Sequence, residues 1–498
     1  MSHWKQPIAM KPNESSTTSG QILHLDPKDQ WKPIDYIRNI VFFILRHPVR
    51  EDILRTSLDN LIRNHLPILG SKIQSDGKQG GLFCQLPTPS HDGLLFGWSS
   101  RRVQTTLAAS QLLPASNISG SQGVIWGKSI VDLEKEWTPT TWPRARYEDK
   151  PDTATFLVHL TKYEDATVVC TNIPHAIVDQ LGFSSFVRAW LQVARGEKPA
   201  QFLQLERGAL DGPKDISEKE LQRKATYRVT TAKERAGILL GFIPELILQP
   251  SETRRLLVFP EDLIANLREK HQAKIALTHG TKLQLTNGDI VAALLLKAAR
   301  GRHPALMAEQ PYLHNAIMYS TAHFSISRDT SVCDIAYHNR LAVIEALKPE
   351  NVDRAFAVTR EIALRGYSIH TCEPGELSFT ITNWTAAWHG IDFSTCRDQA
   401  AGEDEELVAD PEQHAEPQHL PTPSPLVFGH SLPRGRPTRC KWDQISLQAS
   451  DVANYWPLVN AQIMCKAEGG YWCDFTSSTK NMALVDQLMS VDPLLESI

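Results

Sequence analysis

One stretch of this sequence constrains the fold more than any other. Residues 168–173 form a largely apolar run rich in β-branched side chains, which ends at Pro174, and His175 and Asp179 follow at once. Behind them, apolar residues recur at helical spacing until Gly196. This order is typical of a strand, a tight turn and a helix, with His175 where the chain leaves the strand. We therefore expect the rest of the chain to be arranged around this turn.

Segments with strand character alternate with segments of helical periodicity along the chain. We expect strands at residues 40–45, 155–163, 167–173, 317–326 and 377–384, helices at 52–66, 290–300, 352–364 and 482–489, and a hairpin at 462–476. Alternation of this kind, with hairpins among the strands, indicates a mixed α/β fold.

The length of the chain, 498 residues, exceeds what one small core accommodates, so two domains are expected. Residues 1–20 are polar and predict a mobile tail. An N-terminal subdomain would span 21–205, a charged crossover 206–235, and a C-terminal subdomain 236–498. Within the last, the acidic, proline-bearing stretch at about 398–425 predicts a disordered insertion.

The charge of the chain restricts its partners. A net charge of −4 offers no electrostatic footprint for nucleic acid. Eight acidic residues and no Lys or Arg lie between 398 and 421, so the remaining body is mildly basic. That balance is compatible with a ligand that carries phosphate groups.

The cysteines and the apolar stretches indicate a soluble protein of the cytoplasm. The eight cysteines are scattered and form no C-x-x-C, which favours reduced thiols and gives no reason to expect a metal site. The N-terminus lacks the apolar core of a signal peptide. The longest apolar stretch, residues 237–248, contains Pro244 and Glu245 and is too short to span a bilayer.

The spacing of His175 and Asp179 carries little information alone. In a chain of this length and composition, a histidine followed four residues later by an aspartate occurs about once by chance. A single histidine beside proline at a strand end is more often structural than catalytic. The residues around the pair therefore have to carry the interpretation.

Those residues resemble the characteristic segments of the BAHD-type acyltransferases, CoA-dependent enzymes of plant and fungal secondary metabolism. The segment from His175 to Gly182 and the helix after it resemble the family's H-x-x-x-D-G motif. Further matches follow in the family's order: Leu25, Asp26 and Asp29; residues 54–58 and 66–70; residues 286–293; residues 337–339; residues 381–384 with Asp392 and Phe393; and residues 469–472. Six matches in one order, from about residue 22 to the end, make the resemblance strong.

The chain departs from the family pattern at two places. Gln180 stands where the family has glycine, and Gly182 comes two positions later. Since glycine permits a strained turn or the close approach of a ligand, Gln180 is expected to reshape the pocket floor. The family's D-F-G-W-G segment is replaced by residues 392–396, which points to a divergent, fungal-like branch.

The resemblance implies a fold and a reaction. Two chloramphenicol-acetyltransferase-like subdomains, each a mixed sheet flanked by helices, would hold the active site at their interface. His175 would take the proton of an acceptor hydroxyl, which then attacks an acyl-CoA thioester without a covalent enzyme intermediate. Acetyl-CoA is the expected acyl donor, and a hydroxylated polyketide, terpenoid or alkaloid the expected acceptor. The protein would act as a monomer.

The resemblance also implies roles for residues around His175. Asp179 would pair with an arginine, for which Arg328 is the candidate, and hold the turn; alternatively it caps the following helix. Asp392 would be structural, and Thr382 and Trp384 would line the acceptor side, together with Gln180 and Gly182 at the pocket floor. Because CoA carries phosphates, we consider three CoA-binding candidates, although a solvated surface explains the lysines equally well: Lys274, Lys282 and Thr286.

Two other functions remain open. A peptide-synthetase condensation domain shares the fold and an H-H-x-x-x-D-G motif, but Pro174 precedes His175 here and no carrier segment is evident. The second alternative is a metabolite-binding protein that has kept the scaffold without the activity. Gln180 is the main argument for it.

Overall fold

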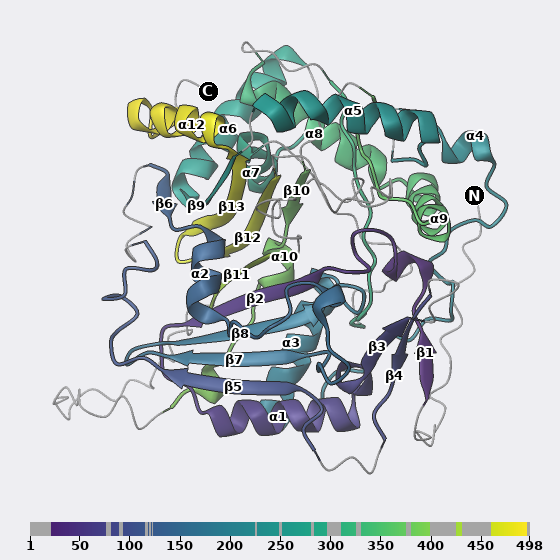
Figure 1. The fold of residues 1–498 in the computed structure, drawn as a ribbon. Coiled ribbons are helices and arrows are strands. Elements are labelled where there is room, and N and C mark those ends of the chain that lie inside the picture. The colour runs from purple at the N-terminus through teal and green to yellow at the C-terminus, as the bar shows by residue number, and fades with distance from the viewer. Residues whose placement is uncertain are drawn as a thin grey trace, which may run out of the picture.

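The fold is that of a computed structural model, which describes residues 21–75, 81–88, 93–114, 118, 121, 123–224, 227–248, 251–279, 283–295, 310–324, 330–374, 380–398, 425–430 and 460–495. The tail at 1–20 and nearly all of the acidic insertion lie outside these residues. Two five-stranded mixed sheets organise the chain (Figure 1). This architecture confirms the predicted fold class.

The first sheet contains the strand that leads to His175. Its strand order is β11 (Leu426–His430), β2 (Arg38–Leu45), β8 (Thr167–Pro174), β7 (Leu157–Lys162) and β5 (Gly97–Arg102). All neighbours are antiparallel except β5 and β7. Every residue of the central strands β2 and β8 is buried, which explains why both read as apolar runs in the sequence.

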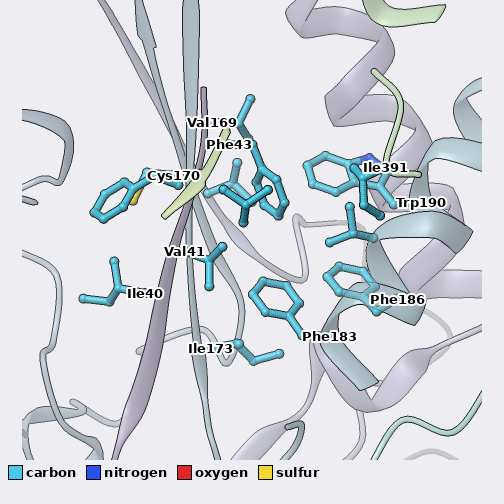
Figure 2. Packing of buried hydrophobic residues seen from close by; sticks show 14 of the residues in the cluster. Ile40, Val41, Phe43, Val169, Cys170, Ile173, Phe183, Phe186, Trp190 and Ile391 are labelled. Atoms are coloured by element: carbon cyan, nitrogen blue, oxygen red, sulfur yellow. The ribbon is translucent and has the colours of Figure 1, made fainter. Parts of the chain in front are cut away.

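Two helices pack against each other beside this sheet, α1 (Glu51–Asn64) and α3 (Gln180–Ala194) (Figure 1). Figure 2 shows Phe183, Phe186 and Trp190 of α3 pointing toward the side chains of β2 and β8. The rings of Phe183 and Phe186 stack with centroids 5.8 Å apart. As expected from the sequence, α3 ends just before Gly196, whose φ of +76° suits glycine and stops the helix.

The second sheet stands between the first sheet and a group of helices (Figure 1). Its order is β10 (Thr380–Asn383), β12 (Asn460–Ala467), β13 (Gly470–Ser478), β9 (Glu252–Pro260) and β6 (Ile125–Gly127), and only β10 and β12 are parallel. A core cluster joins one face of the sheet to α6 (Glu261–Thr278), α7 (Asn287–Leu295) and α8 (Val332–Ala346). The predicted hairpin is confirmed as β12 and β13, with positive φ at Glu468 and Gly469.

Smaller elements complete the described fold. A third sheet is built from β1 (Ile22–His24), β4 (Leu82–Gln85) and β3 (Lys72–Ser75). The other helices are α2 (Ile130–Trp137), α4 (Glu218–Leu221), α5 (Ala232–Leu248), α9 (Pro349–Leu364), α10 (Thr385–Trp388) and α12 (Thr479–Val491). Single 3-10 turns lie at η1 (Pro27–Asp29), η2 (Pro67–Gly70), η3 (Arg146–Glu148) and η4 (Ser394–Cys396).

The two sheets exchange strands along the sequence. Strand β6, from the segment predicted as the N-terminal subdomain, joins the second sheet, and β11, from the C-terminal segment, joins the first. Hydrogen-bond pairing between strands far apart in sequence decides this, and no local pattern reveals it. Each sheet is thus completed by the other half of the chain.

One predicted element is wrong. The described part of the expected strand at 317–326, residues 317–324, has no regular secondary structure. The chain just before it, at residues 314–316, directs hydrogen bonds to the turn around His175 instead of to a neighbouring strand. Residues 314–316 therefore belong to the candidate site.

Two further observations concern the described residues as a whole. Their helices include none that combines the length and the apolar character needed to cross a membrane. The seven described cysteines are buried as free thiols.

Candidate active site

His175 lies directly after β8, where this strand pairs with the start of β2. The register places Pro174 opposite Arg38, and the backbone N–H of His175 donates to the carbonyl of Ile37 at 2.8 Å. The side chain is almost fully buried, with 2% of its surface exposed. The sheet therefore fixes the backbone of His175 from one side.

Arg38 secures this end of the two strands. Its guanidinium is buried and donates to Asp149 and Asn172, each at 3.1 Å. Burial lowers the pKa of Arg38 to about 10, which still leaves it charged at neutral pH. These hydrogen bonds connect the start of β2 to Asn172 of β8 and to Asp149.

Residues 312–316, which we call the strap, hold the turn from the other side. The ring nitrogen Nδ1 of His314 lies 3.1 Å from the carbonyl of Ile177 and must donate to it, since a carbonyl only accepts. The amide Nδ2 of Asn315 donates to the carbonyl of His175 itself at 2.9 Å. The backbone N–H of Ala316 donates to Asp179 at 3.2 Å. Three consecutive strap residues thus fix three points of one turn.

A buried ion pair anchors the strap. The carboxylate of Asp29 accepts both the backbone N–H and the side-chain amide of Asn315, at 3.0 and 2.8 Å. Lys28 lies 2.8 Å from the other oxygen of the same carboxylate, and both residues are buried. Burial alone would lower the pKa of Lys28, but the neighbouring Asp29 carboxylate outweighs it and raises that pKa. No sequence pattern distinguishes Asn315, and only the family resemblance drew attention to Asp29.

Asp179 caps α3 and at the same time receives the strap. One carboxylate oxygen accepts the N–H of Gly182 at 2.8 Å, and the other accepts the N–H of Ala316. The capping interpretation is therefore confirmed. Among the residues that the structure describes, Asp179 has no ion pair, and the predicted partner Arg328 lies outside them.

Replacement of Asp179 should separate these two functions. We expect Asp179→Ala to lower the free energy of unfolding by about 2–4 kcal/mol, because the helix loses its cap and a buried strap N–H loses its acceptor. Asp179→Asn should lose less, since asparagine caps helices equally well. Urea unfolding of the two variants measures the losses: equal losses would contradict the cap, and an Asp179→Asn protein as stable as the wild type would contradict the strap contact.

Gly182 allows the strap to cross the first turn of α3. A Cβ atom on Gly182 would lie 1.8 Å from the carbonyl oxygen of Leu313, far closer than any real contact. The close approach at this glycine is thus made by the protein's own backbone. Contact of Gly182 with substrate stays a prediction.

Gln180 begins α3 immediately after the capping residue. Its side chain is completely buried, and neither its amide nitrogen nor its amide oxygen has a hydrogen-bond partner among the described residues. A buried amide without partners is costly. This observation is consistent with the predicted substrate contact but does not test it.

Thr382 and Trp384 meet at the end of β10. The indole N–H of Trp384 donates to the hydroxyl of Thr382 at 3.1 Å, and Trp384 is buried. The following helix, α10, reaches α3 through the rings of Trp388 and Phe183, whose centroids are 5.6 Å apart. Helix α10, which directly follows this pair, therefore contacts α3, the helix that begins after the His175 turn.

A cavity of about 340 Å³ opens beside the turn. Asp179, Gly182, Arg188, His314 and Ala386 are among its lining residues, whereas His175 and Thr382 are not. The cavity lies on the side of the turn where the carboxylate of Asp179 caps α3. The guanidinium of Arg188 already donates to the carbonyls of Ala387 and His389 at its edge.

Comparison with known proteins finds similarity around the His175 turn. A family model described as the Transferase family matches residues 136–241, which include the whole His175 turn and α3. Acetyltransferase adrJ of Penicillium rubens is 21% identical over 280 residues, which are 50% of this chain and 56% of that protein. Acetyltransferase adrJ of Penicillium roqueforti is 22% identical over 321 residues, 56% of this chain and 63% of that protein. The segment around His175 is thus similar to the Transferase family, and about half of the chain is similar to the two acetyltransferases.

Solved structures share the fold of this chain. F. graminearum TRI101 complexed with coenzyme A and deoxynivalenol aligns with a TM-score of 0.57 at 11% identity, over 94% of this chain and 97% of that one. Vinorine synthase aligns with a TM-score of 0.51 at 12% identity, over 95% and 93%. The matches to the curated Penicillium relatives span only 56–63% of their lengths.

The remaining residues to which the family resemblance gives roles are spread over the second half of the chain. Asp392 is exposed and accepts from the backbone N–H and hydroxyl of Ser394, which shapes a local turn. Lys274 is exposed on α6, and Lys282 lies outside the described residues. Thr286 precedes α7 and exchanges hydrogen bonds with Asp289. The CoA-binding assignments of these three residues stay predictions.

The start of α7 lies beside the end of β10. A Cβ atom on Gly288 would be 3.4 Å from the side-chain nitrogen of Asn383 and 3.6 Å from the hydroxyl of Thr286. Thr286 is therefore close to the segment that carries Thr382 and Trp384. Within the described residues, no cluster of His, Cys, Asp or Glu could hold a metal ion.

Proposed function

We propose that this protein is an acyl-CoA-dependent O-acyltransferase that transfers an acetyl group to a hydroxyl of a fungal secondary metabolite. The observation that carries the proposal is the turn at His175, which β2 holds on one side and the strap on the other. The two curated relatives are named acetyltransferases, and TRI101 was solved with coenzyme A and a mycotoxin, which supports the same donor and acceptor classes here.

His175 is the proposed general base. An alcohol is a poor nucleophile at neutral pH, so its proton must be removed as the oxygen attacks the thioester carbonyl. A neutral imidazole can accept that proton. The new C–O bond forms, the C–S bond breaks, and the CoA thiolate leaves and takes up the proton from His175. Because the backbone of His175 is bonded at both N–H and C=O, its ring needs little reorganisation.

Asp179 does not serve as the base in this proposal. Its two carboxylate oxygens are already committed to the N–H groups of Gly182 and Ala316. It acts through the backbone instead, by keeping the turn and the helix start in register. Asp179 is therefore a positioning residue for His175.

Thr382 is the proposed donor to the oxyanion. Its oxygen accepts the indole N–H of Trp384, which leaves its own hydroxyl hydrogen available to a substrate. A preplaced donor stabilises the negative charge that develops on the carbonyl oxygen. Trp384 orients this hydroxyl and contributes apolar surface, while Gln180 and Gly182 line the floor.

The donor site is proposed at the second half of the chain. Lys274, Lys282 and Thr286 would contact the phosphates or the pantetheine arm of acyl-CoA. Of these, Thr286 is the best placed, because the start of α7 lies against Asn383, directly next to Thr382. The co-substrate is consumed in each turnover, so no permanently bound cofactor is needed.

Purified protein with acetyl-CoA and a panel of hydroxylated terpenoids, polyketides and alkaloids tests the proposal. We expect acceptor-dependent release of free CoA thiol, together with a product that mass spectrometry identifies as the acetyl ester. A reaction without acceptor controls for simple hydrolysis. Tight binding of a panel member with no thiol release would instead favour the non-catalytic binding protein, for which the buried Gln180 is the argument.

A further inference from the structure

The two faces of the second sheet have different surroundings. Side chains alternate along each strand, and register partners on neighbouring strands share a face. One face packs into the core cluster with α6, α7 and α8, through Ile381, Ala461, Ile463, Cys473 and Leu257. The register then places Thr382, Gln462, Asp474 and Leu256 in one row on the opposite face. Leu256 belongs to the core cluster of the first sheet, so this row faces the other half of the molecule.

Gln462 is a member of this row whose side-chain amide makes no hydrogen bond to a described residue. Only 1% of its surface is exposed, and neither its amide nitrogen nor its amide oxygen has a hydrogen-bond partner among the described residues. Nearly all buried polar groups in proteins are hydrogen-bonded, because an unpaired one costs free energy. A buried amide with two unpaired ends therefore needs an explanation.

The polar neighbours of Gln462 in this row bond to other groups. Thr382, its partner on β10, accepts from the indole of Trp384. Asp474, its partner on β13, is buried and receives the Nε of Arg254 on both carboxylate oxygens at 2.8 Å. Both of these polar groups stand next to Gln462, yet neither is bonded to it. Within the described residues, the amide is therefore without a partner.

We infer that Gln462 binds the acceptor, by hydrogen-bonding an oxygen that neighbours the hydroxyl to be acylated. This inference rests on the proposed function, and it adds the class of acceptor: a vicinal diol or α-hydroxy ketone. An amide both donates and accepts, which matches a hydroxyl or carbonyl group. Parallel strands lie about 4.8 Å apart, so Gln462 and Thr382 can reach oxygens on adjacent carbons.

The same geometry makes Gln462 a specificity residue. A site built to hydrogen-bond an oxygen discriminates strongly against an analogue without it, because the buried amide is then left unpaired. Gln462 makes no proposed contact with the reacting hydroxyl or the thioester. Replacement of Gln462 should therefore change which acceptor is preferred and leave the KM for acetyl-CoA unchanged.

Gln462→Met is the variant that tests this role, because methionine keeps the length of the side chain and removes the amide. The probes are cyclohexane-1,2-diol and cyclohexanol, which differ by one oxygen. We expect the wild-type protein to prefer the diol at least tenfold in kcat/KM and the variant to lose that preference. The KM for acetyl-CoA should stay within twofold.

The stability of the free protein gives a second readout. If the amide is unpaired before substrate binds, Gln462→Met should raise the Tm. The matched control is Ile463→Val on the opposite face of the same strand, which should lower the Tm and leave the diol preference intact. A fall in Tm for Gln462→Met would show that the amide already has a partner and would overturn the inference.

The remaining outcomes separate this inference from the proposed function. An unchanged diol preference in Gln462→Met, with normal thiol release, overturns the role of Gln462 and leaves the acyltransferase standing. Absence of thiol release by the wild-type protein, with these probes and with the wider panel, overturns both.

Discussion

His175→Ala should reduce acceptor-dependent thiol release by about 10²–10⁴-fold, the usual contribution of a general base. The strap and β2 bind only the backbone N–H and C=O of this residue, so both contacts survive the substitution. The turn should keep its shape and acetyl-CoA should still bind. Steady-state kinetics and calorimetric titration with CoA measure the two effects.

Two further variants make this result interpretable. His175→Asn fills more of the space that the buried ring occupies and guards against a general loss of folding. His65→Ala, at an exposed position after α1, removes a histidine without touching the turn and should leave turnover unchanged. Near-normal activity in His175→Ala, with the protein folded, would contradict the general-base mechanism.

Gly182→Ala should be the most destructive single-methyl change in the described structure near the site. The new Cβ would lie 1.8 Å from the carbonyl oxygen of Leu313, and a backbone oxygen cannot move aside as a flexible side chain can. The strap would have to lift from α3, which breaks the contacts to Ile177, His175 and Asp179. We expect a loss of about 3 kcal/mol or more in the free energy of unfolding.

The loss of activity should follow the loss of the strap. We expect kcat for Gly182→Ala to fall at least tenfold even at temperatures where the variant is fully folded. Gly196→Ala is the matched control: its φ of +76° makes it strained, but nothing lies within 4 Å of the new methyl group. That control should lose about 1 kcal/mol of stability and keep its activity. Normal turnover in folded Gly182→Ala would mean that the strap does not position His175.

Local sequence patterns predicted the central part of the fold well. The strands at β2, β7 and β8, the helix α3 and the hairpin of β12 and β13 follow from periodicity and turn residues alone. The β7–β8 and β12–β13 pairs join neighbours along the chain, whereas β2 is recognisable from its apolar run although its partners β8 and β11 are distant in sequence. The predicted strand at 317–326 is wrong. The segment has the composition of a strand, but the chain just before it is hydrogen-bonded to the His175 turn.

The candidate site was predictable in part. His175 and Asp179 stand out only through the family resemblance, since their spacing alone occurs by chance. The capping role of Asp179 was foreseen as an alternative, because aspartate before a helical pattern is a common N-cap. Asn315 and Gln462 were not foreseen. Nothing in their immediate neighbourhood distinguishes them from other polar residues.

The sequence by itself determined a strand, a turn and a helix with His175 at the strand exit, because these depend on nearest neighbours along the chain. Only the tertiary structure decided what holds that turn and what faces it. Asp29 and Asn315 are 286 positions apart, and their contact exists because the strap folds back onto the turn at the end of β8. Gln462 became a candidate only when register placed it between Thr382 and Asp474, neither of which is bonded to it. Hydrogen-bond satisfaction is a property of the folded neighbourhood, and no stretch of sequence contains it.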